Sequence, residues 1–426
     1  MSSIKNAAAS SLAKVTSAAA TAATPAPAFV PRTRFEVSSD ITRSYFLGHH
    51  QAAVARMSKV LSNIGLIIEC RDFRVPLSSW NPILEHKLQS LGGHQAIPRI
   101  VVYTKRDLGP GRPRDLPIVD ALRRFHSAES YSVDTPGGFL SRDPTESAAD
   151  GDRGRSRRDK DDAGDPPSAL FLGKGESNAS GDRALMSAIR ALAKSDASHS
   201  SHLLGLRAII IGMPNAGKSS LLNRLRHRGV KANTKAASTG AQPGVTRKLG
   251  TPVRILSNEA DEDLPERGVF VMDTPGVFVP YVGDPESMLK LALVNCVRDG
   301  LVNPVTLADY LLYHLNLRGQ TKAYEWLCST PTNDVNVFLE AAARRTGKLL
   351  PGGLPAIDAI AEYVISLYRR GELGKLVLDD VNEETLRRAR IASLSPPTSL
   401  NQARKAEKER RSIASKERYR AGLKGS

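Results

Sequence analysis

The chain has 426 residues, of which 41% are hydrophobic and 24% charged, and its formal net charge is +16. This composition is that of an ordinary globular protein with room for about two to three domains. The three cysteines lie far apart without a CxxC pair, and no run approaches the ~18 apolar residues of a membrane-spanning helix, so a disulfide framework, a zinc ribbon and a spanning segment are excluded.

The first 35 residues are rich in Ala and Ser and carry four basic groups and no acidic one. Such a composition is typical of a transit peptide, because these segments are basic, Ser-rich and poor in acids. A disordered tail that targets nothing is the alternative. We therefore expect residues 1–35 to be a transit peptide or a disordered segment.

Short apolar runs alternate with helical patterns over residues 36–285. The runs cover residues 64–68, 100–103, 169–172, 208–211 and 269–272. Strands that alternate with helices predict an α/β domain, with a parallel sheet flanked by helices. Residues 141–167 contain no Ile, Leu, Val or aromatic residue, so we expect a disordered insertion in a surface loop, with a charged binding patch as the alternative.

A candidate base-binding loop, Thr104-Lys105-Arg106-Asp107, follows the second apolar run and fits the pattern [NT]KxD. A carboxylate at Asp107 can accept hydrogen bonds from N1–H and the 2-amino group of guanine, and adenine offers neither in that geometry. The aliphatic stem of Lys105 can lie along the base. A chance surface loop is the alternative, but the position after a strand favours a ligand site.

A candidate phosphate-binding loop, Gly212 to Ser219, fits G-x-x-x-x-G-K-[ST] between a strand and a helical pattern. Backbone N–H groups of such a loop surround the phosphates, Lys218 contacts the β- and γ-phosphate oxygens during catalysis, and the Ser219 hydroxyl ligates Mg²⁺. The residues expected to bind the nucleotide here are Asn215, Ala216, Gly217, Lys218, Ser219 and Ser220.

Two further loops complete the pattern of a nucleotide switch. Asp273-Thr274-Pro275-Gly276 follows the last apolar run, so Asp273 can hold Mg²⁺ through water and the Gly276 N–H can contact the γ-phosphate. Thr246 lies between the phosphate loop and Asp273, where a switch threonine ligates Mg²⁺ and assists catalysis. The base loop precedes the phosphate loop, the reverse of the usual order, which predicts a circularly permuted P-loop GTPase domain.

The pattern becomes helical after about residue 286. Asn303-Pro304 predicts a helix start, Leu307, Leu311 and Leu315 share a face, and Gly371 can end a later helix. We expect an all-α domain over residues 286–400, followed by a basic tail over residues 401–426. The tail carries nine basic and three acidic residues. It indicates a polyanionic partner, with a solvated charged helix as the alternative.

Together, these motifs resemble the circularly permuted GTPases of the RbgA/YlqF type, and among them the mitochondrial ribosome-assembly branch. The resemblance covers most of residues 44–380 and extends to the segments 45–49, 72–76, 79–82, 291–293 and 369–375. It implies GTP hydrolysis coupled to maturation of the mitochondrial large ribosomal subunit, with contacts to its rRNA. It also implies a monomer in the mitochondrial matrix, peripheral to the matrix face of the inner membrane.

The resemblance assigns three further features. Val277 stands where ordinary GTPases have a water-orienting Gln, and the family implies His49 as the catalytic residue, with a structural His as the alternative. Asn215 matches the P-loop Asn of K⁺-stimulated relatives, with a simple turn residue as the alternative. The segment 173–177 departs from the family's Ser-Ala-like loop, so the second guanine contact is unassigned. A GTP-dependent scaffold and a signalling GTPase at the inner membrane are the alternative functions.

Overall fold

The computed structural model describes residues 29–37, 63–81, 97–126, 169–174, 179–199, 205–230, 250–257, 264, 268–275 and 284–394, with tail positions 405, 408–409 and 412–413. The predicted insertion 141–167 lies outside these residues, as do the first 28 residues of the expected transit peptide.

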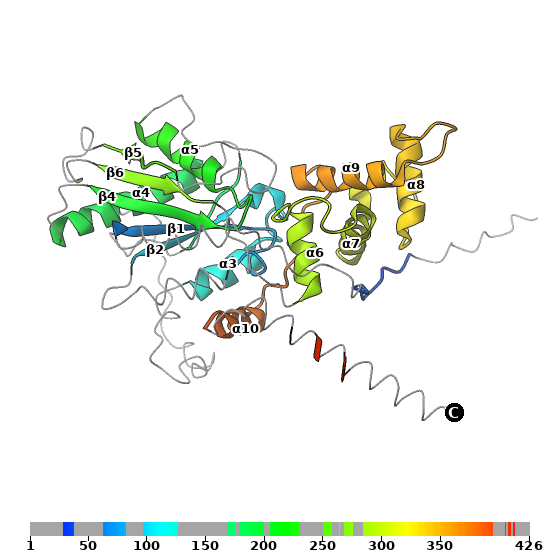
Figure 1. The fold of residues 1–426 in the computed structure, drawn as a ribbon, viewed down its shortest axis with the longest axis horizontal. Helices are drawn as coiled ribbons and strands as arrows, with labels where there is room; N and C mark the ends of the chain where they lie inside the picture. The colour runs from blue at the N-terminus through cyan, green and yellow to red at the C-terminus, as the bar shows by residue number, and fades with distance from the viewer. Residues whose placement is uncertain are drawn as a thin grey trace, which may run out of the picture.

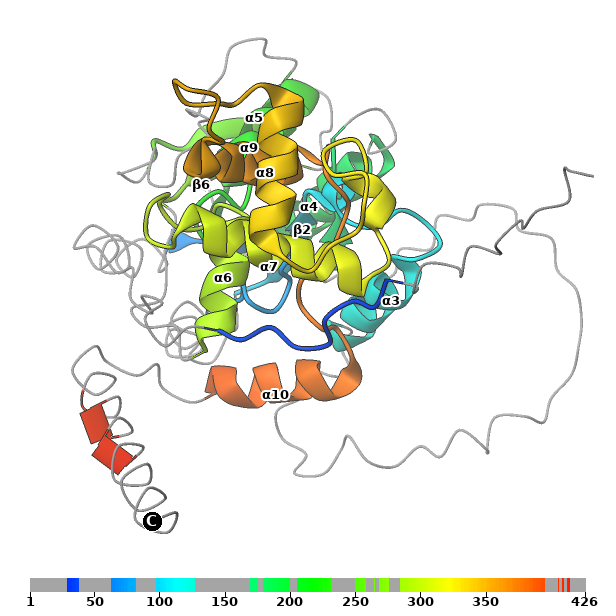
Figure 2. The same ribbon diagram turned by 90° about the vertical axis from the view of Figure 1, so that its right-hand side faces the viewer.

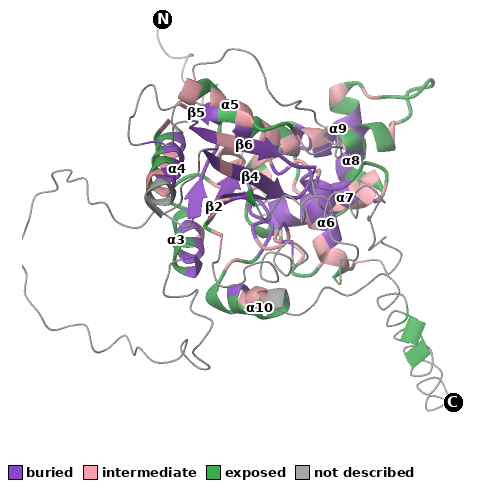
Figure 3. Ribbon diagram, turned by 60° about the vertical axis from the view of Figure 1, so that its left-hand side comes forward, coloured by how far each residue is buried: buried purple, intermediate pink, exposed green. Residues whose placement is uncertain are grey.

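Within the described residues, the chain forms a six-stranded sheet in the order β3-β2-β1-β4-β6-β5. The strands are β1 (Leu66–Asp72), β2 (Arg99–Thr104), β3 (Ala169–Phe171), β4 (Leu206–Gly212), β5 (Val253–Leu256) and β6 (Val269–Asp273). Every predicted apolar run overlaps a strand. β1, β4 and β6 are buried along nearly their whole length because helices cover both faces of the sheet (Figure 3).

The predicted parallel sheet needs one correction. β3, β2, β1, β4 and β6 are parallel neighbours, but β5 pairs with β6 in the antiparallel direction. The sequence gives no apolar run for this edge strand because Arg254 is exposed and Val253 is only half-buried. The sheet is therefore mixed, as doubly wound sheets with an antiparallel edge strand often are.

The helices of this α/β domain pack on opposite faces of the sheet. α4 (Ala179–His199) and α5 (Lys218–Val230) cover one face, where Leu185 and Leu225 meet Ile68 and Ile210. α3 (Leu116–Phe125) and α10 (Glu383–Leu394) cover the other face through a cluster that contains Leu122 and Leu386. A short 3-10 turn, η2 (Arg106–Leu108), follows β2.

The helical domain lies beside the carboxyl edge of the sheet (Figure 1). It contains α6 (Pro285–Leu293), α7 (Pro304–Leu317), η6 (Thr321–Ala323), α8 (Val335–Thr346) and α9 (Ile357–Arg370). The predicted helix start is confirmed, because the Asn303 side chain accepts a hydrogen bond from the Val305 N–H at 2.8 Å. The predicted helix end is confirmed as well, because Gly371 has a φ of 81°.

Two segments cross the domain boundaries that the sequence suggested. Residues 29–37 lie along the helical domain (Figure 2), where Arg32 pairs with Asp309 at 2.5 Å and the ring of Phe35 meets that of Tyr310 at 5.1 Å. α10 belongs to the expected helical domain by sequence, but it packs under the sheet on the side of α3. The helical domain thus includes a segment from near the N-terminus and excludes α10.

The cysteines Cys70, Cys296 and Cys328 are buried free thiols. Burial raises the pKa of the Cys70 thiol to about 12, so this group is a neutral part of the core at ordinary pH. Among the residues that the structure describes, no helix has the length and hydropathy needed to span a bilayer.

Candidate functional site

The candidate nucleotide site lies where β2, β1, β4 and β6 end at one edge of the sheet. The register pairs Thr104 with Asp72, Gly212 with Cys70, and Asp273 with Ile210. Ligands bind at this edge in open α/β sheets, where the loops after the strands lead into helices whose N-termini face the ligand. The fold therefore gathers motifs that lie more than a hundred residues apart in the sequence.

The phosphate loop has the backbone that its glycines allow. A Cβ atom on Gly212 would lie 2.3 Å from the carbonyl oxygen of Cys70, so only glycine fits beside β1. Asn215 and Gly217 both have positive φ values, 55° and 87°. This turn leads directly into α5 at Lys218, so the N-terminal N–H groups of that helix point into the loop. Such an arrangement favours an anion such as a phosphate.

Lys218, Ser219 and Asp273 form the polar floor of the site. Lys218 is buried, and its Nζ donates a hydrogen bond to the carbonyl of Met213 at 2.7 Å. Burial lowers the pKa of Lys218. The Ser219 hydroxyl donates to Asp273 Oδ2 at 2.5 Å. The Ser219 hydroxyl thus joins the phosphate loop to the end of β6, and the fold brings the three predicted site residues together.

The donor set at this floor fits Mg²⁺. Asp273 Oδ1 is buried and has no hydrogen-bond partner within the described part of the chain. Burial raises the pKa of Asp273, against the opposing effects of the Ser219 hydroxyl and the Lys218 charge. A hydroxyl and a carboxylate are hard oxygen ligands, and a divalent cation would satisfy the orphaned oxygen. The other predicted ligand, Thr246, lies outside the described residues, as do His49 and Gly276.

The candidate base loop is tied to its neighbours at two points. The Thr104 hydroxyl donates to the carbonyl of Ala216 at 2.8 Å, which joins the base loop to the phosphate loop. Lys105 has a left-handed backbone with a φ of 58°, and its Nζ donates to Asp72 Oδ2 at 2.9 Å. Asp72 begins the segment 72–76 of the family resemblance, and no local pattern gave this residue a role. In the structure, this carboxylate fixes the ammonium group of Lys105.

Asp72 is itself held by a second cation. Arg74 donates from its guanidinium to both carboxylate oxygens of Asp72, at 3.0 and 2.8 Å. Burial disfavours the Asp72 charge, but Arg74 and Lys105 outweigh it and lower the pKa of Asp72. Arg74 also reaches the carbonyl of Val294 in the helical domain at 3.4 Å. The base loop is therefore connected to the helical domain through two side chains.

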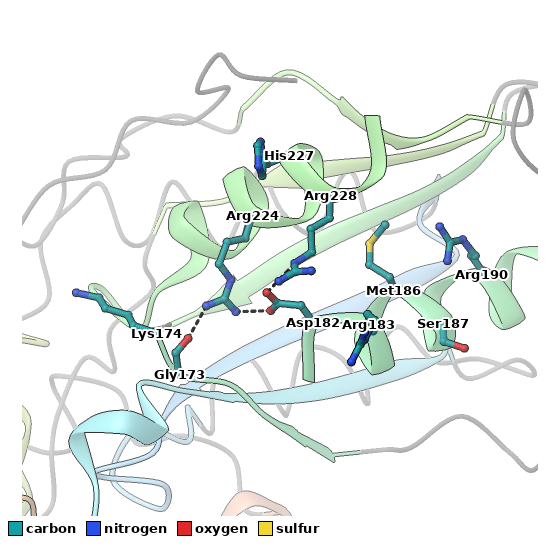
Figure 4. Close-up of a pocket in the computed structure, with 10 residues that line it drawn as sticks. All are labelled: Gly173, Lys174, Asp182, Arg183, Met186, Ser187, Arg190, Arg224, His227 and Arg228. Atoms are coloured by element: carbon teal, nitrogen blue, oxygen red, sulfur yellow. Dashed lines mark hydrogen bonds and ion pairs between the residues drawn. The ribbon is translucent and has the colours of Figure 1, made fainter. Parts of the chain in front are cut away.

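Gly173 and Lys174, the described part of the segment that the sequence left unassigned, contact the base loop and α5, and Figure 4 shows the side of this contact that faces α5. The N–H of Lys174 donates to Asp107 Oδ1 at 3.0 Å. The carbonyl of the same peptide, on Gly173, accepts from Arg224 Nη1 at 2.7 Å, and Arg224 Nη2 pairs with Asp182 at 2.8 Å. A planar peptide fixes its C=O and N–H together, so Arg224 sets the direction of the N–H that holds Asp107.

Asn215 links the phosphate loop to the helical domain. Its Nδ2 donates to the carbonyl of Asn295 at 2.8 Å. Met213, two positions before Asn215, is buried within the hydrophobic core of the helical domain. Sequence reasoning predicted Asn215 as a nucleotide and K⁺ residue, but it could not foresee this contact with a residue 80 positions away.

Comparison with known proteins places these features in context. Residues 207–325 match the family model described as 50S ribosome-binding GTPase. The chain is 36% identical over 341 residues to Mitochondrial GTPase 1 of Schizosaccharomyces japonicus, covering 80% of this chain and 91% of that protein. It is 32% identical over 365 residues to Mitochondrial GTPase 1 of Schizosaccharomyces pombe, covering 84% and 95%.

More distant similarities extend over comparable lengths. Mitochondrial ribosome-associated GTPase 1 of Xenopus tropicalis is 27% identical, with 82% of this chain and 98% of that protein covered. Among solved structures, the crystal structure of GNP-bound YlqF from T. maritima is similar with a TM-score of 0.41 and 16% identity, covering 78% of this chain and 99% of the other.

Proposed function

Because this chain belongs to the Mitochondrial GTPase 1 family, and is a mitochondrial GTPase, we propose that it is a switch that binds the mitochondrial large ribosomal subunit and promotes its maturation. The observation that carries this proposal is the direct contact of the phosphate loop with the helical domain, from Asn215 to Asn295. A change at the phosphates can thus reach a second domain, which is the property that a switch needs.

In this proposal, the nucleotide lies along the carboxyl edge of the sheet. Asp107 accepts from the guanine base, and Lys105 covers it. The phosphate-loop N–H groups and Lys218 hold the phosphates. Mg²⁺ would be held by Ser219 and Asp273 together with Thr246, and it would neutralise charge on the phosphates.

The hydrolytic water requires a residue that the floor of the site does not provide. Val277 follows the Asp273 motif, and an apolar side chain cannot orient water. We assign this task to His49. Asn215 would contribute to a K⁺ site beside the phosphates, and the Gly276 N–H would contact the γ-phosphate.

The partner in this proposal is the large subunit and its rRNA. The names of the relatives and of the matching family model, which mention ribosome association and ribosome binding, support it. The basic tail would contact RNA phosphates, so binding would weaken steeply with salt. The protein would act as a monomer in the matrix, peripheral to the inner membrane, after residues before the packed segment 29–37 have directed import.

The experiment is GTP turnover by a chain that begins at residue 29, because residues 29–37 pack on the helical domain and must be kept. Turnover is measured in K⁺ or Na⁺, with and without purified mitochondrial large subunits. We expect the subunits to stimulate turnover more in K⁺ than in Na⁺, and the His49→Ala variant to lose the stimulation. Tight GTP binding without stimulation by any subunit preparation would instead favour a GTP-dependent scaffold.

A further inference from the structure

A groove lies between α4 and α5 (Figure 4), on the face of the sheet opposite to the one that α3 and α10 cover. Its cavity has a volume of about 830 Å³. The basic side chains that line it are Lys174, Arg183, Arg190, Arg224, His227 and Arg228. The groove does not include Lys218 or Asp273 of the nucleotide site, but its Lys174 adjoins the base loop through the Lys174 N–H bond to Asp107.

The charge of the groove is poorly balanced. Among the lining residues that the structure describes, Asp182 alone is acidic, and this buried carboxylate already pairs with Arg224 at 2.8 Å and with Arg228 at 3.0 Å. Arg183 and Arg190 are exposed and form no ion pair with any residue that the structure describes. The groove thus presents more cationic groups than its carboxylate can neutralise.

The two unpaired arginines are placed on one face of α4. Seven residues separate Arg183 from Arg190, which is about two helical turns and roughly 10 Å along the axis. Side chains at this spacing lie on the same side of a helix. Arg224, His227 and Arg228 have the i, i+3, i+4 spacing that places them together on α5. Two helices therefore turn cationic faces toward a shared concave surface, which concentrates a positive potential.

We infer that this groove docks the phosphodiester backbone of an RNA strand. The inference rests on the proposed ribosomal function and names a surface for it. Guanidinium groups form paired hydrogen bonds with phosphate oxygens, and neighbouring phosphates of one strand can engage arginines on both helices. Contacts of this kind hold an RNA in position without reading its sequence.

The groove is less suited to a lipid surface. Peripheral membrane binding combines cationic groups with exposed apolar side chains that enter the interface. Met186 is the large apolar side chain of the groove, and it is buried, with 4% of its surface exposed. A concave surface would also hold its arginines away from a flat bilayer, whereas a strand of RNA can enter it.

The test uses the chain from residue 29 onward and fluorescently labelled rRNA fragments from purified mitochondrial large subunits. The variant is Arg183→Gln/Arg190→Gln, because neither arginine contacts the described residues of the nucleotide loops. Arg224 is avoided because it positions the Gly173–Lys174 peptide. The matched control is Arg123→Gln/Arg254→Gln, which removes two exposed arginines elsewhere on the same domain. Both variants keep the basic tail, so its contribution to binding is constant.

We expect the groove variant to bind the fragments about 10-fold more weakly at near-physiological salt. The slope of the logarithm of its association constant against the logarithm of salt concentration should also be smaller in magnitude by about 2. The control should stay close to the wild-type protein, and GTP turnover without RNA should be unchanged in both. Equal losses in the two variants would overturn the proposal, because only net charge would then matter. Unchanged binding by the groove variant would overturn it as well.

A second arm separates this proposal from other ligands and from the proposed function. If the groove variant loses binding to vesicles that contain about one-fifth anionic lipid while RNA binding is intact, the groove is a lipid site and the proposal is wrong. If wild-type protein binds large subunits but the groove variant binds equally well, only this inference fails. If wild-type protein binds neither subunits nor fragments, the ribosomal function fails with it.

Discussion

The Nδ2 of Asn215 donates a hydrogen bond to the backbone carbonyl of Asn295 at 2.8 Å, which joins the phosphate loop to the helical domain. Asn215 also has a left-handed backbone, with a φ of 55°, which Asn and Asp tolerate better than most residues. The contact therefore depends on a side-chain amide at a position where few other side chains fit. Coupling between the domains should be sensitive to this one group.

Replacing Asn215 by Asp keeps the backbone tolerance but removes the donor and turns a carboxylate toward the Asn295 carbonyl. We expect the free energy of unfolding to fall by about 1–2 kcal/mol, because the half-buried carbonyl of Asn295 loses its donor and faces a carboxylate instead. Urea denaturation checks this. Asn336→Asp, the same chemical change at an exposed position of α8, is the control and should cost less than about 1 kcal/mol. An equal loss in both variants would contradict the coupling.

Arg224 should affect guanine binding although it does not reach the base loop directly. Arg224→Lys keeps the charge but cannot hold both the Gly173 carbonyl and Asp182, as the guanidinium does. The Lys174 N–H that supports Asp107 then loses its orientation. We expect the Kd for GTP to rise about 10-fold or more, which corresponds to a charged hydrogen bond of about 1.5–3 kcal/mol.

Fluorescent-nucleotide titration measures this effect, and Arg228→Lys is its matched control. Arg228 pairs with the same carboxylate of Asp182, at 3.0 Å, but no contact of Arg228 with the Gly173 carbonyl occurs in the described structure. The control should leave the Kd for GTP nearly unchanged. Equal effects of the two variants would mean that Asp182, rather than the Gly173–Lys174 peptide, is what matters.

The segment 29–37 should stabilise the helical domain. The ring of Phe35 packs against the rings of Tyr310 and Tyr313, with centroid distances of 5.1 and 5.6 Å. Phe35→Ala should lower the free energy of unfolding by about 1–3 kcal/mol, because a partly buried aromatic side chain is lost. Thermal unfolding checks this value. Val30→Ala is the control and should have little effect, because 74% of the Val30 surface is exposed. Identical melting of both variants would indicate that the segment detaches in solution.

His314 should make the protein less stable in acid. Burial, with smaller contributions from Arg318 and Lys290, lowers the pKa of His314 to about 3. The unfolded chain takes up a proton near pH 6.5, whereas the folded one does not until about pH 3. The contribution of His314 to the free energy of unfolding is therefore fully present above about pH 6.5. It is lost as the pH falls from there to about 3, by at most about 1.4 kcal/mol per pH unit.

Urea denaturation of His314→Phe across this pH window measures the contribution. The phenyl ring can keep the aromatic contact with Tyr310, whose ring lies 4.5 Å away, and it has no proton to bind. We expect the variant to lose less stability than the wild-type protein as the pH falls. His227→Gln, at an exposed position, should retain the wild-type pH dependence. A variant that parallels the wild type would show that carboxylates alone cause the acid sensitivity.

The sequence by itself determined the elements and loops whose signals are local. The apolar runs of β1, β2, β3, β4 and β6, the cap at Asn303 and the stop at Gly371 depend on neighbouring residues, because propensity, capping and turn chemistry act within a few positions. The phosphate loop and the base loop are recognisable for the same reason. Their order in the chain was enough to predict a permuted domain.

Only the tertiary structure decided the contacts between distant segments. The peptide of Gly173 and Lys174 has no sequence signal of its own, and it becomes a support for Asp107 only because β3 lies beside β2. Phe35 packs against the core of the helical domain, far along the chain. Beside it, the Tyr313 hydroxyl donates a hydrogen bond to the carbonyl of Thr33, 280 positions earlier. Such partners are chosen by closure of the sheet and docking of the helices, and no local pattern encodes that geometry.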